Sequence, residues 1–273
     1  MQTSQGIRSR PVSRPGLSRP LRREYFLVPI TLVLAVGLWE LVVGWGNYQP
    51  FILPTPRRVV ARFAVALSDG TLVTHTLVTL REVFAGLAMG LSVAVILGYL
   101  LAKSRLLERI LSPYLVASQA IPIVALAPLL VIWFGAGSFS KVLVCALTLF
   151  FPVLINTIVG IRGVDPNLVD LMRSLRATRW QVFTMLEVPA ALPVLFGGLK
   201  VGVTLSVIGA VVGEFVGSDR GLGFLVNLAR GIFDTPLMFV ALFMLMGIAL
   251  VLYFSISALE SALLRWDRPE DAR

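Results

Sequence analysis

Long hydrophobic runs separated by short polar stretches dominate the chain. Each run is close to the ~20 residues that a helix needs to cross the hydrocarbon core of a bilayer. Lipid offers no partner to free backbone groups, and the runs lack the alternating polar face of a barrel strand, so helices are expected. The six runs are residues 26–46, 77–101, 114–134, 142–161, 190–212 and 237–258. This pattern predicts an all-α integral membrane protein with six transmembrane helices.

A polar, arginine-bearing segment, residues 164–193, lies between the fourth and fifth runs. A helix is predicted to begin at Asp165, because its carboxylate can accept from the free amides of a first turn and Pro166 is tolerated at the first helical position. Hydrophobic residues then recur on one helical face: Leu168, Leu171, Met172 and Leu175. From periodicity alone, this stripe fits a helix on a bilayer surface as well as one that docks to a protein.

A second short helix is predicted to start near Thr178. Thr178 and Gln181 have the spacing of a capping box, in which each side chain bonds the backbone of the other. The helix carries Trp180 and Phe183, and Pro189 is expected to end it. The segment is therefore predicted to form two short helices joined by a corner.

Composition and charge agree with a membrane protein. The chain is 57% hydrophobic and 14% charged, with a mean hydropathy of +0.86, which the surface of a soluble domain would not tolerate. Most of the 24 Lys and Arg residues fall on one side of the membrane if the N-terminus is inside. The positive-inside rule then places both termini and residues 164–193 in the cytoplasm. The basic N-terminus lacks the motif support of a nucleic-acid-binding region, so no nucleic-acid partner is expected.

The order of features in residues 164–193 resembles the coupling segment, or EAA loop, of the inner-membrane permease subunits of ABC importers. In that family a Glu-Ala-Ala triplet precedes a glycine and a proline-rich ending. Here Asp170 begins the triplet position, Arg176 replaces the glycine, and the ending is VPAALP at 188–193. Glycine would allow a left-handed backbone at the corner, whereas arginine resists it. We call residues 164–193 the coupling segment.

The resemblance implies that the coupling segment docks to a cytoplasmic ATPase. The residues expected to take part are Asp165, Asp170, Arg173, Leu175, Arg176, Trp180, Phe183 and Pro189.

A second block, residues 118–137, carries two prolines inside a hydrophobic run. Proline removes a backbone donor and bends a helix, and the freed carbonyls tend to face protein or a water-filled path. The block resembles the Ile-Pro, Ala-Pro and Trp-Phe-Gly elements of permeases for nitrate, sulfonate, taurine and bicarbonate. The bend can line a solute route or be a structural kink. The candidate route residues are Gln119, Pro122, Pro128, Trp133, Asn156 and Glu214.

The outer connections, residues 213–223 and 233–239, resemble the branch of these permeases assigned to thiamine pyrimidines and riboflavin-like solutes. Four parts of the chain are expected. They are a disordered basic cytoplasmic tail (1–25), a first transmembrane helix with an outer amphipathic loop (26–76), a permease core (77–260) and a cytoplasmic tail (261–273). Within the outer loop, Arg58 and Arg62 are expected on the wet side of a helix.

No phosphate-binding G-x-x-x-x-G-K-[ST] loop occurs in the sequence, and no catalytic triad, paired-carboxylate site or Cys/His metal cluster is evident. The chain is therefore not expected to be an enzyme or to hold a metal or cofactor. The resemblance implies the permease subunit of an ABC importer in the cytoplasmic (inner) membrane, moving a small polar or organic solute. The implied partners are ATPase subunits that bind ATP and Mg²⁺, a second permease copy of the same or a related chain, an external solute-binding protein, and membrane lipid.

Two other functions fit parts of the sequence. A stand-alone secondary transporter or channel would be expected to show internal repeats, matched helix interruptions or a buried acidic relay, and no clear repeat is present. An inactive permease-like partner or membrane anchor fits the altered triplet and Arg176.

Overall fold

The computed structural model describes residues 24–264, which form helices and contain no strand. The chain divides into two compact units, Met1–Tyr48 and Gln49–Arg273. Helix α1 (Glu24–Gly46) belongs to the first unit and the other helices to the second. The predicted tails are residues 1–25 and 261–273. They lie outside the described residues, except for the few residues of each tail between 24 and 264.

Five helices among the described residues are long and apolar enough to cross a membrane, and a bent pair can supply a sixth crossing. The five are α1, α3 (Thr71–Lys103), α6 (Ser138–Arg162), α9 (Val188–Gly217) and α11 (Thr235–Leu263). The pair is α4 (Arg105–Gln119) and α5 (Ile123–Phe134), whose axes differ by 95°. When the bent pair is counted as one crossing, the prediction of an all-α membrane protein with six crossings is confirmed.

The third hydrophobic run is not one helix. Helix α4 starts earlier than predicted, where the Ser104 hydroxyl caps it by accepting from the amide of Leu107 at 3.3 Å. The helix then ends at Gln119, and Pro122, which has no N–H and an extended backbone (φ −62°, ψ 124°), precedes α5. Pro128 lies inside α5 and does not break it. Of the bends predicted at Pro122 and Pro128, the helix breaks only at Pro122.

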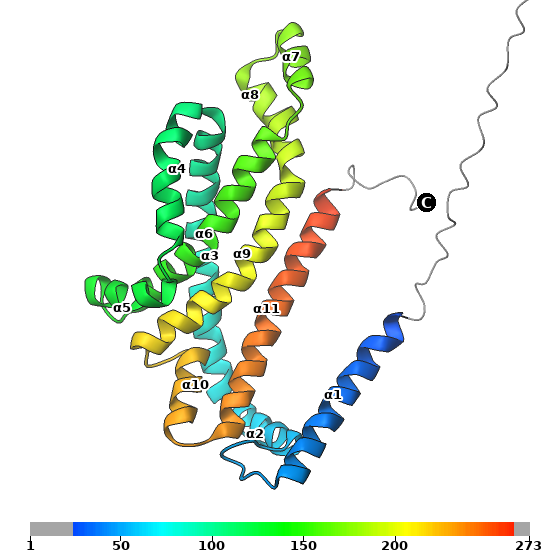
Figure 1. Cartoon of the computed structure of the whole chain (residues 1–273), viewed down its shortest axis with the longest axis vertical. Helices are drawn as coiled ribbons and strands as arrows, with labels where there is room; N and C mark the ends of the chain where they lie inside the picture. The colour runs from blue at the N-terminus through cyan, green and yellow to red at the C-terminus, as the bar shows by residue number, and fades with distance from the viewer. Residues whose placement is uncertain (1–23, 265–273) are drawn as a thin grey trace, which may run out of the picture. The chain divides into compact units, whose positions relative to one another are not determined.

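Helices α3, α6 and α9 pack closely at the centre of the second unit, with α6 against both of the others (Figure 1). A Cβ atom added to Gly90 of α3 would lie 2.7 Å from the carbonyl oxygen of Ala146 in α6. One added to Gly209 of α9 would lie 3.0 Å from the Cα of Cys145. Small residues let helices approach this closely in a bilayer, where burying apolar surface gives little driving force. Close packing of the helix backbones at these glycines therefore holds the three helices together.

Two short helices flank the long ones at one end of the second unit (Figure 1). They are α2 (Pro56–Ser68) and α10 (Leu222–Gly231). Arg62 of α2 does not lie free on a wet surface as expected, because its Nε donates to Asp234 at 2.8 Å and both side chains are half-buried. Asp234 also caps α11 by accepting from the Leu237 amide at 3.1 Å. One carboxylate thus ties α2 to the start of α11.

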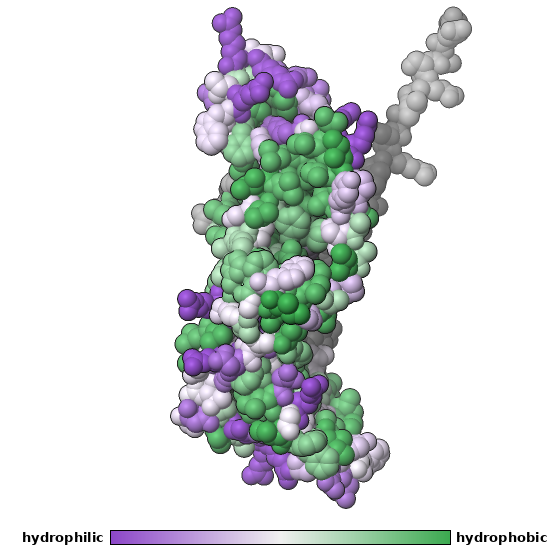
Figure 2. Space-filling view, turned by 90° about the vertical axis from the view of Figure 1, so that its left-hand side faces the viewer, coloured by the Kyte–Doolittle hydropathy of each residue, from purple (hydrophilic) through white to green (hydrophobic). Residues whose placement is uncertain are grey.

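Figure 2 shows that, on the face it draws, hydrophobic residues cover the middle and hydrophilic residues gather toward the two ends. The upper hydrophilic end in this view is where α7 (Pro166–Ser174) and α8 (Arg179–Val182) project (Figure 1). This distribution fits helices immersed in lipid with their ends in water.

The close approach of α3 and α6 predicts a specific sensitivity to one methyl group. Gly90→Ala should destabilise the protein by about 1–3 kcal/mol, because the added atom meets backbone that cannot rotate away. Thermal unfolding in detergent measures this as a lowered midpoint.

Gly247→Ala is the matched control for that measurement. Gly247 also lies in a long helix, α11, but a Cβ there meets nothing within 4 Å. Equal midpoints for the two variants would contradict the packing described for α3 and α6.

Candidate functional site

Both helices of the coupling segment start as their sequences predict. The Asp165 carboxylate accepts from the Asn167 amide at 2.9 Å, and Pro166 is the first residue of α7. At α8, the Thr178 amide donates to the Gln181 side chain at 2.7 Å and the Gln181 amide donates to the Thr178 hydroxyl at 3.3 Å. This reciprocal pair is the predicted capping box. Local hydrogen bonds therefore fix where each short helix begins.

The corner between these helices turns at Arg176, whose φ is +58°. Arginine thus adopts the left-handed backbone that the glycine of the family would supply, although it resists this region by about 1–2 kcal/mol. Two hydrogen bonds close the turn, from the Arg176 amide to the Arg173 carbonyl at 2.9 Å and from the Ala177 amide to the Met172 carbonyl at 3.0 Å. Each contributes roughly 1 kcal/mol. These bonds, typical of a helix C-terminus, offset the strain.

Pro189 does not end the second helix, so that prediction is wrong. A π-helical turn, η1 (Phe183–Glu187), joins α8 to α9 without interruption, and the Val188 amide donates to the carbonyl of Phe183 five residues earlier. A proline ring normally clashes with the carbonyl four residues before it. The wider π turn carries that carbonyl away, which allows a continuous helix through Pro189.

The α7–α8 corner, residues 166–182, presents a largely unburied surface. No residue of α7 or α8 is buried. Leu175 and Trp180 are each 70% exposed, and the Trp180 ring lies 5.5 Å from that of Phe183. Arg173 pairs with Asp170 at 3.1 Å, and both of these side chains are also exposed. Large apolar side chains ringed by charges at the hydrophilic end of the bundle are suited to binding another protein.

A cavity of about 580 Å³ lies behind the corner, between the coupling segment and the end of α3. Its wall includes three cationic side chains, Lys103, Arg173 and Arg179, and one carboxylate, Glu187. Glu187 is only 3% exposed and accepts hydrogen bonds from Lys103 and, at 3.3 Å, from the Tyr99 hydroxyl. The sequence did not single out Glu187, although a lone carboxylate before a long hydrophobic run is a signal of a buried partner.

The candidate route residues do not form one cluster. Gln119 and Pro122 lie at the bend between α4 and α5, and Pro128 and Trp133 are exposed on α5. Asn156 is half-buried in α6, where its side-chain amide donates to the Pro152 carbonyl at 2.8 Å.

Glu214 is 1% exposed near the end of α9 and holds α10 in place. It accepts from the Thr79 hydroxyl at 2.6 Å and from the Gly223 amide. Gly221 has a φ of +112°, and a Cβ there would overlap the carboxylate. Sequence reasoning missed Glu82, which is buried beside Glu214 and was detectable as the only carboxylate in the second hydrophobic run.

None of the described residues forms a group of three or more His, Cys, Asp or Glu side chains that could hold a metal ion. The architecture is that of a multi-pass membrane protein with an exposed corner between two of its spanning helices. Residues 90–265 match the model of the family described as binding-protein-dependent transport system inner membrane component. The chain belongs to this family and is a permease subunit of an ABC importer in the inner membrane, so it is a transport protein and not an enzyme.

Known relatives cover most of the chain. It is 52% identical to the riboflavin transport system permease protein RibX of Chloroflexus aurantiacus, over 88% of this chain and 90% of that one. It is 36% identical to the formylaminopyrimidine transport permease protein ThiX of Halalkalibacterium halodurans, over 92% of this chain and 100% of that one. Its fold resembles that of the inward-facing MetNI methionine ABC transporter, with a TM-score of 0.55 and 20% identity over 69% of this chain and 93% of that one.

The left-handed backbone at Arg176 predicts which substitutions the corner tolerates. Arg176→Gly should leave the corner about as ordered as before, because the strain relieved, ~1–2 kcal/mol, is close to the conformational entropy that glycine adds, ~0.5–1 kcal/mol. Arg176→Ile should loosen it, because a β-branched residue is less tolerated at positive φ. Hydrogen–deuterium exchange of residues 166–182 measures this, and equal exchange in the two variants would contradict the turn.

Proposed function

We propose that the α7–α8 corner is the docking site for a separate cytoplasmic ATPase that hydrolyses ATP with Mg²⁺. The observation that carries this proposal is the exposure of Leu175 and Trp180 on a corner that the rest of the described chain leaves uncovered. Both helices are capped and the turn between them is closed, so the surface is preorganised for a partner. Asp165 and Arg176 act by shaping the corner, while Arg173 and Trp180 contact the ATPase.

The proposed orientation places the corner and both chain ends in the cytoplasm. Arg162, Arg173, Arg176 and Arg179 lie in or beside the corner, and this concentration of positive charge favours the inner side. In this orientation α2 and α10 lie on the outer side, where a solute-binding protein delivers its cargo.

The working permease is proposed to contain two copies of this chain, or one copy and a related chain. On α9, Val201, Ile208 and Phe215 recur every seven residues and are all exposed. This outward stripe would face the second copy or the solute route between the copies. Asn156 and the α4–α5 bend with Gln119, Pro122, Pro128 and Trp133 remain candidates for lining that route.

The proposed cargo is a flat heteroaromatic solute of the riboflavin or pyrimidine class. A cavity of about 550 Å³ lies between the end of α9 and α10, and its wall includes Glu214, Phe215, Phe224 and Asn227. Phenyl rings can stack on such a solute and an amide can bond its edge. The relatives RibX and ThiX, named for riboflavin and formylaminopyrimidine transport, share 52% and 36% of their aligned residues with this chain.

Substitutions on the corner should separate docking from folding. Trp180→Ala and Arg173→Glu should each reduce the amount of ATPase that co-purifies with the permease by about tenfold or more, because loss of a central aromatic or reversal of a charge at an interface costs about 2 kcal/mol or more. Quantitative co-purification from lipid nanodiscs is the measurement.

Trp45→Ala is the control for the docking test, since Trp45 is also strongly exposed, at 93%, but lies in the first unit. If wild type recruits no ATPase, or if Trp45→Ala weakens recruitment as much as Trp180→Ala does, the docking proposal fails.

The cargo proposal predicts a ranking of solutes. Proteoliposomes that contain the permease, its ATPase and its binding protein should accumulate radiolabelled riboflavin or formylaminopyrimidine at least about tenfold faster than taurine, because a site built from aromatic walls and one amide gains little from a small sulfonate. ATP-free vesicles give the background. Faster uptake of taurine would reject the heteroaromatic class.

A further inference from the structure

The α7–α8 corner has little direct packing against the bundle that it must move. Helix α7 has no extensive packing with any other described helix. The cavity of about 580 Å³ separates the corner from the end of α3. A displacement of the corner can therefore reach the bundle only through its two flanks, the end of α6 before it and the η1 turn after it.

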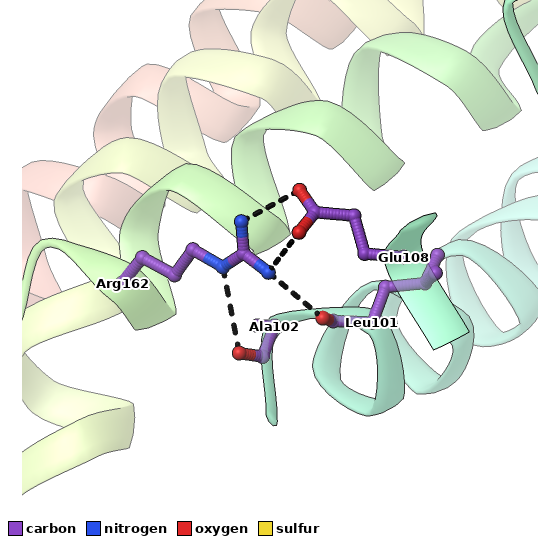
Figure 3. A network of polar contacts seen from close by, with 4 residues as sticks. All are labelled: Leu101, Ala102, Glu108 and Arg162. Atoms are coloured by element: carbon purple, nitrogen blue, oxygen red, sulfur yellow. Dashed lines mark hydrogen bonds and ion pairs between the residues drawn. The ribbon is translucent and has the colours of Figure 1, made fainter. Parts of the chain in front are cut away.

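The first flank is fastened by Arg162, the last residue of α6. Its guanidinium makes two hydrogen bonds to the Glu108 carboxylate, at 2.6 and 2.7 Å (Figure 3). The same group donates to the carbonyls of Leu101 at 3.1 Å and Ala102 at 3.4 Å. A planar guanidinium is suited to this fork of contacts, which lysine could not make. Arg162 thus joins α6 to the last turn of α3 and the first turn of α4 together.

The second flank is fastened by Glu187, the last residue of η1. Its buried carboxylate pairs with Lys103 and accepts from the Tyr99 hydroxyl at 3.3 Å. Lys103 also lies over the Tyr99 ring, 5.6 Å from its centre. A buried carboxylate that loses its cation is strongly unfavourable, so this contact resists separation.

Both contacts end on the same element. The partners of Arg162 and Glu187 all lie between Tyr99 and Glu108, where α3 ends and Ser104 starts α4. This α3–α4 turn leads through α4 into the bend before α5. The two flanks of the corner are therefore held to one piece of backbone that belongs to neither of the helices carrying the corner.

We propose that Arg162 and Glu187 are positioning residues that transmit movement of the docked corner to the α3–α4 turn. Through them, α3 and the bent pair α4–α5 move together with α6 and α9 when the ATPase pulls the corner. This inference rests on the proposed docking function and adds which side chains carry its force. Without the two contacts, ATP would still be hydrolysed on the docked partner while the bundle followed incompletely.

The test measures the number of solute molecules imported per ATP hydrolysed by the complete importer in proteoliposomes. Arg162→Gln and Glu187→Gln should each lower this ratio by about tenfold, the scale of a typical coupling between sites. The amount of co-purified ATPase should stay at the wild-type level, because neither residue lies on the exposed face of the corner. Arg162→Glu combined with Glu108→Arg should recover part of the ratio.

Arg62→Gln is the matched control, because it breaks an ion pair of comparable exposure on α2, away from the corner. An unchanged ratio in both Gln variants, or the same decrease in Arg62→Gln, would overturn the inference. A decrease explained fully by lost ATPase would also overturn it and assign the two residues to docking. If the wild-type complex recruits no ATPase, the docking proposal itself fails, and this inference fails with it.

Hydrogen–deuterium exchange distinguishes transmission of movement from a role in stability alone, because lost stability would not remove the ATP response of α4 while leaving that of α7. In the wild-type complex, ATP binding should alter exchange in both α7 and α4. In Arg162→Gln and Glu187→Gln, the change in α7 should remain and the change in α4 should disappear. A nucleotide response in α4 that survives both substitutions would overturn the inference.

Discussion

Lipid cannot satisfy a free backbone amide or carbonyl, so the chain crosses it as helices, and three interruptions of those helices show how the backbone is satisfied where the chain changes form. At the bend before α5, Pro122 has no amide to satisfy. In η1, the Val188 amide reaches the Phe183 carbonyl, so the proline that follows sits in an unbroken helix. At Arg176, two backbone bonds close a turn that arginine would not adopt by preference. The lipid therefore requires helices, and the interruptions in those helices lie where the chain bends or turns.

Each end of the second unit has a buried carboxylate, and each also has a partly exposed ion pair, Arg62–Asp234 at one end and Arg162–Glu108 at the other. At the end with α10, Glu214 is buried and holds backbone amides directly. At the end with the corner, Glu187 is buried and pairs with Lys103, whereas Arg162 and Glu108 remain about one-third exposed. Buried bonds resist displacement, whereas partly hydrated ion pairs can exchange partners at smaller cost. Each end thus combines a contact that resists displacement with one that can exchange.

Sequence reasoning succeeded where structure depends on neighbours along the chain. The Asp165 cap and the Thr178–Gln181 box are local hydrogen bonds, and the hydrophobic runs follow from the thickness of a bilayer. It failed for Pro189, because the π turn that accommodates proline leaves no pattern in composition. The residues that we propose for docking could be located in the sequence, but their exposure could not be predicted from it.

The missed contacts join residues far apart in the sequence. Arg162 and Glu108 are separated by 54 positions, and Arg62 and Asp234 by 172. The sequence analysis expected charged residues at helix ends to face water or to set the membrane orientation. No sequence periodicity shows which helix will lie opposite them. Only the packing of helices far apart in the sequence, such as α2 against α11, brings such partners together.

The attachment of α10 has a consequence for how this family can diversify. The amides of Gly221, Leu222 and Gly223 donate to His75, Thr79 and Glu214, so α10 is held by its main chain. Its outward side chains take no part in these bonds and can be replaced without loosening the helix. The α10 surface, which we propose to face the solute-binding protein, can therefore change in sequence while the membrane scaffold stays the same.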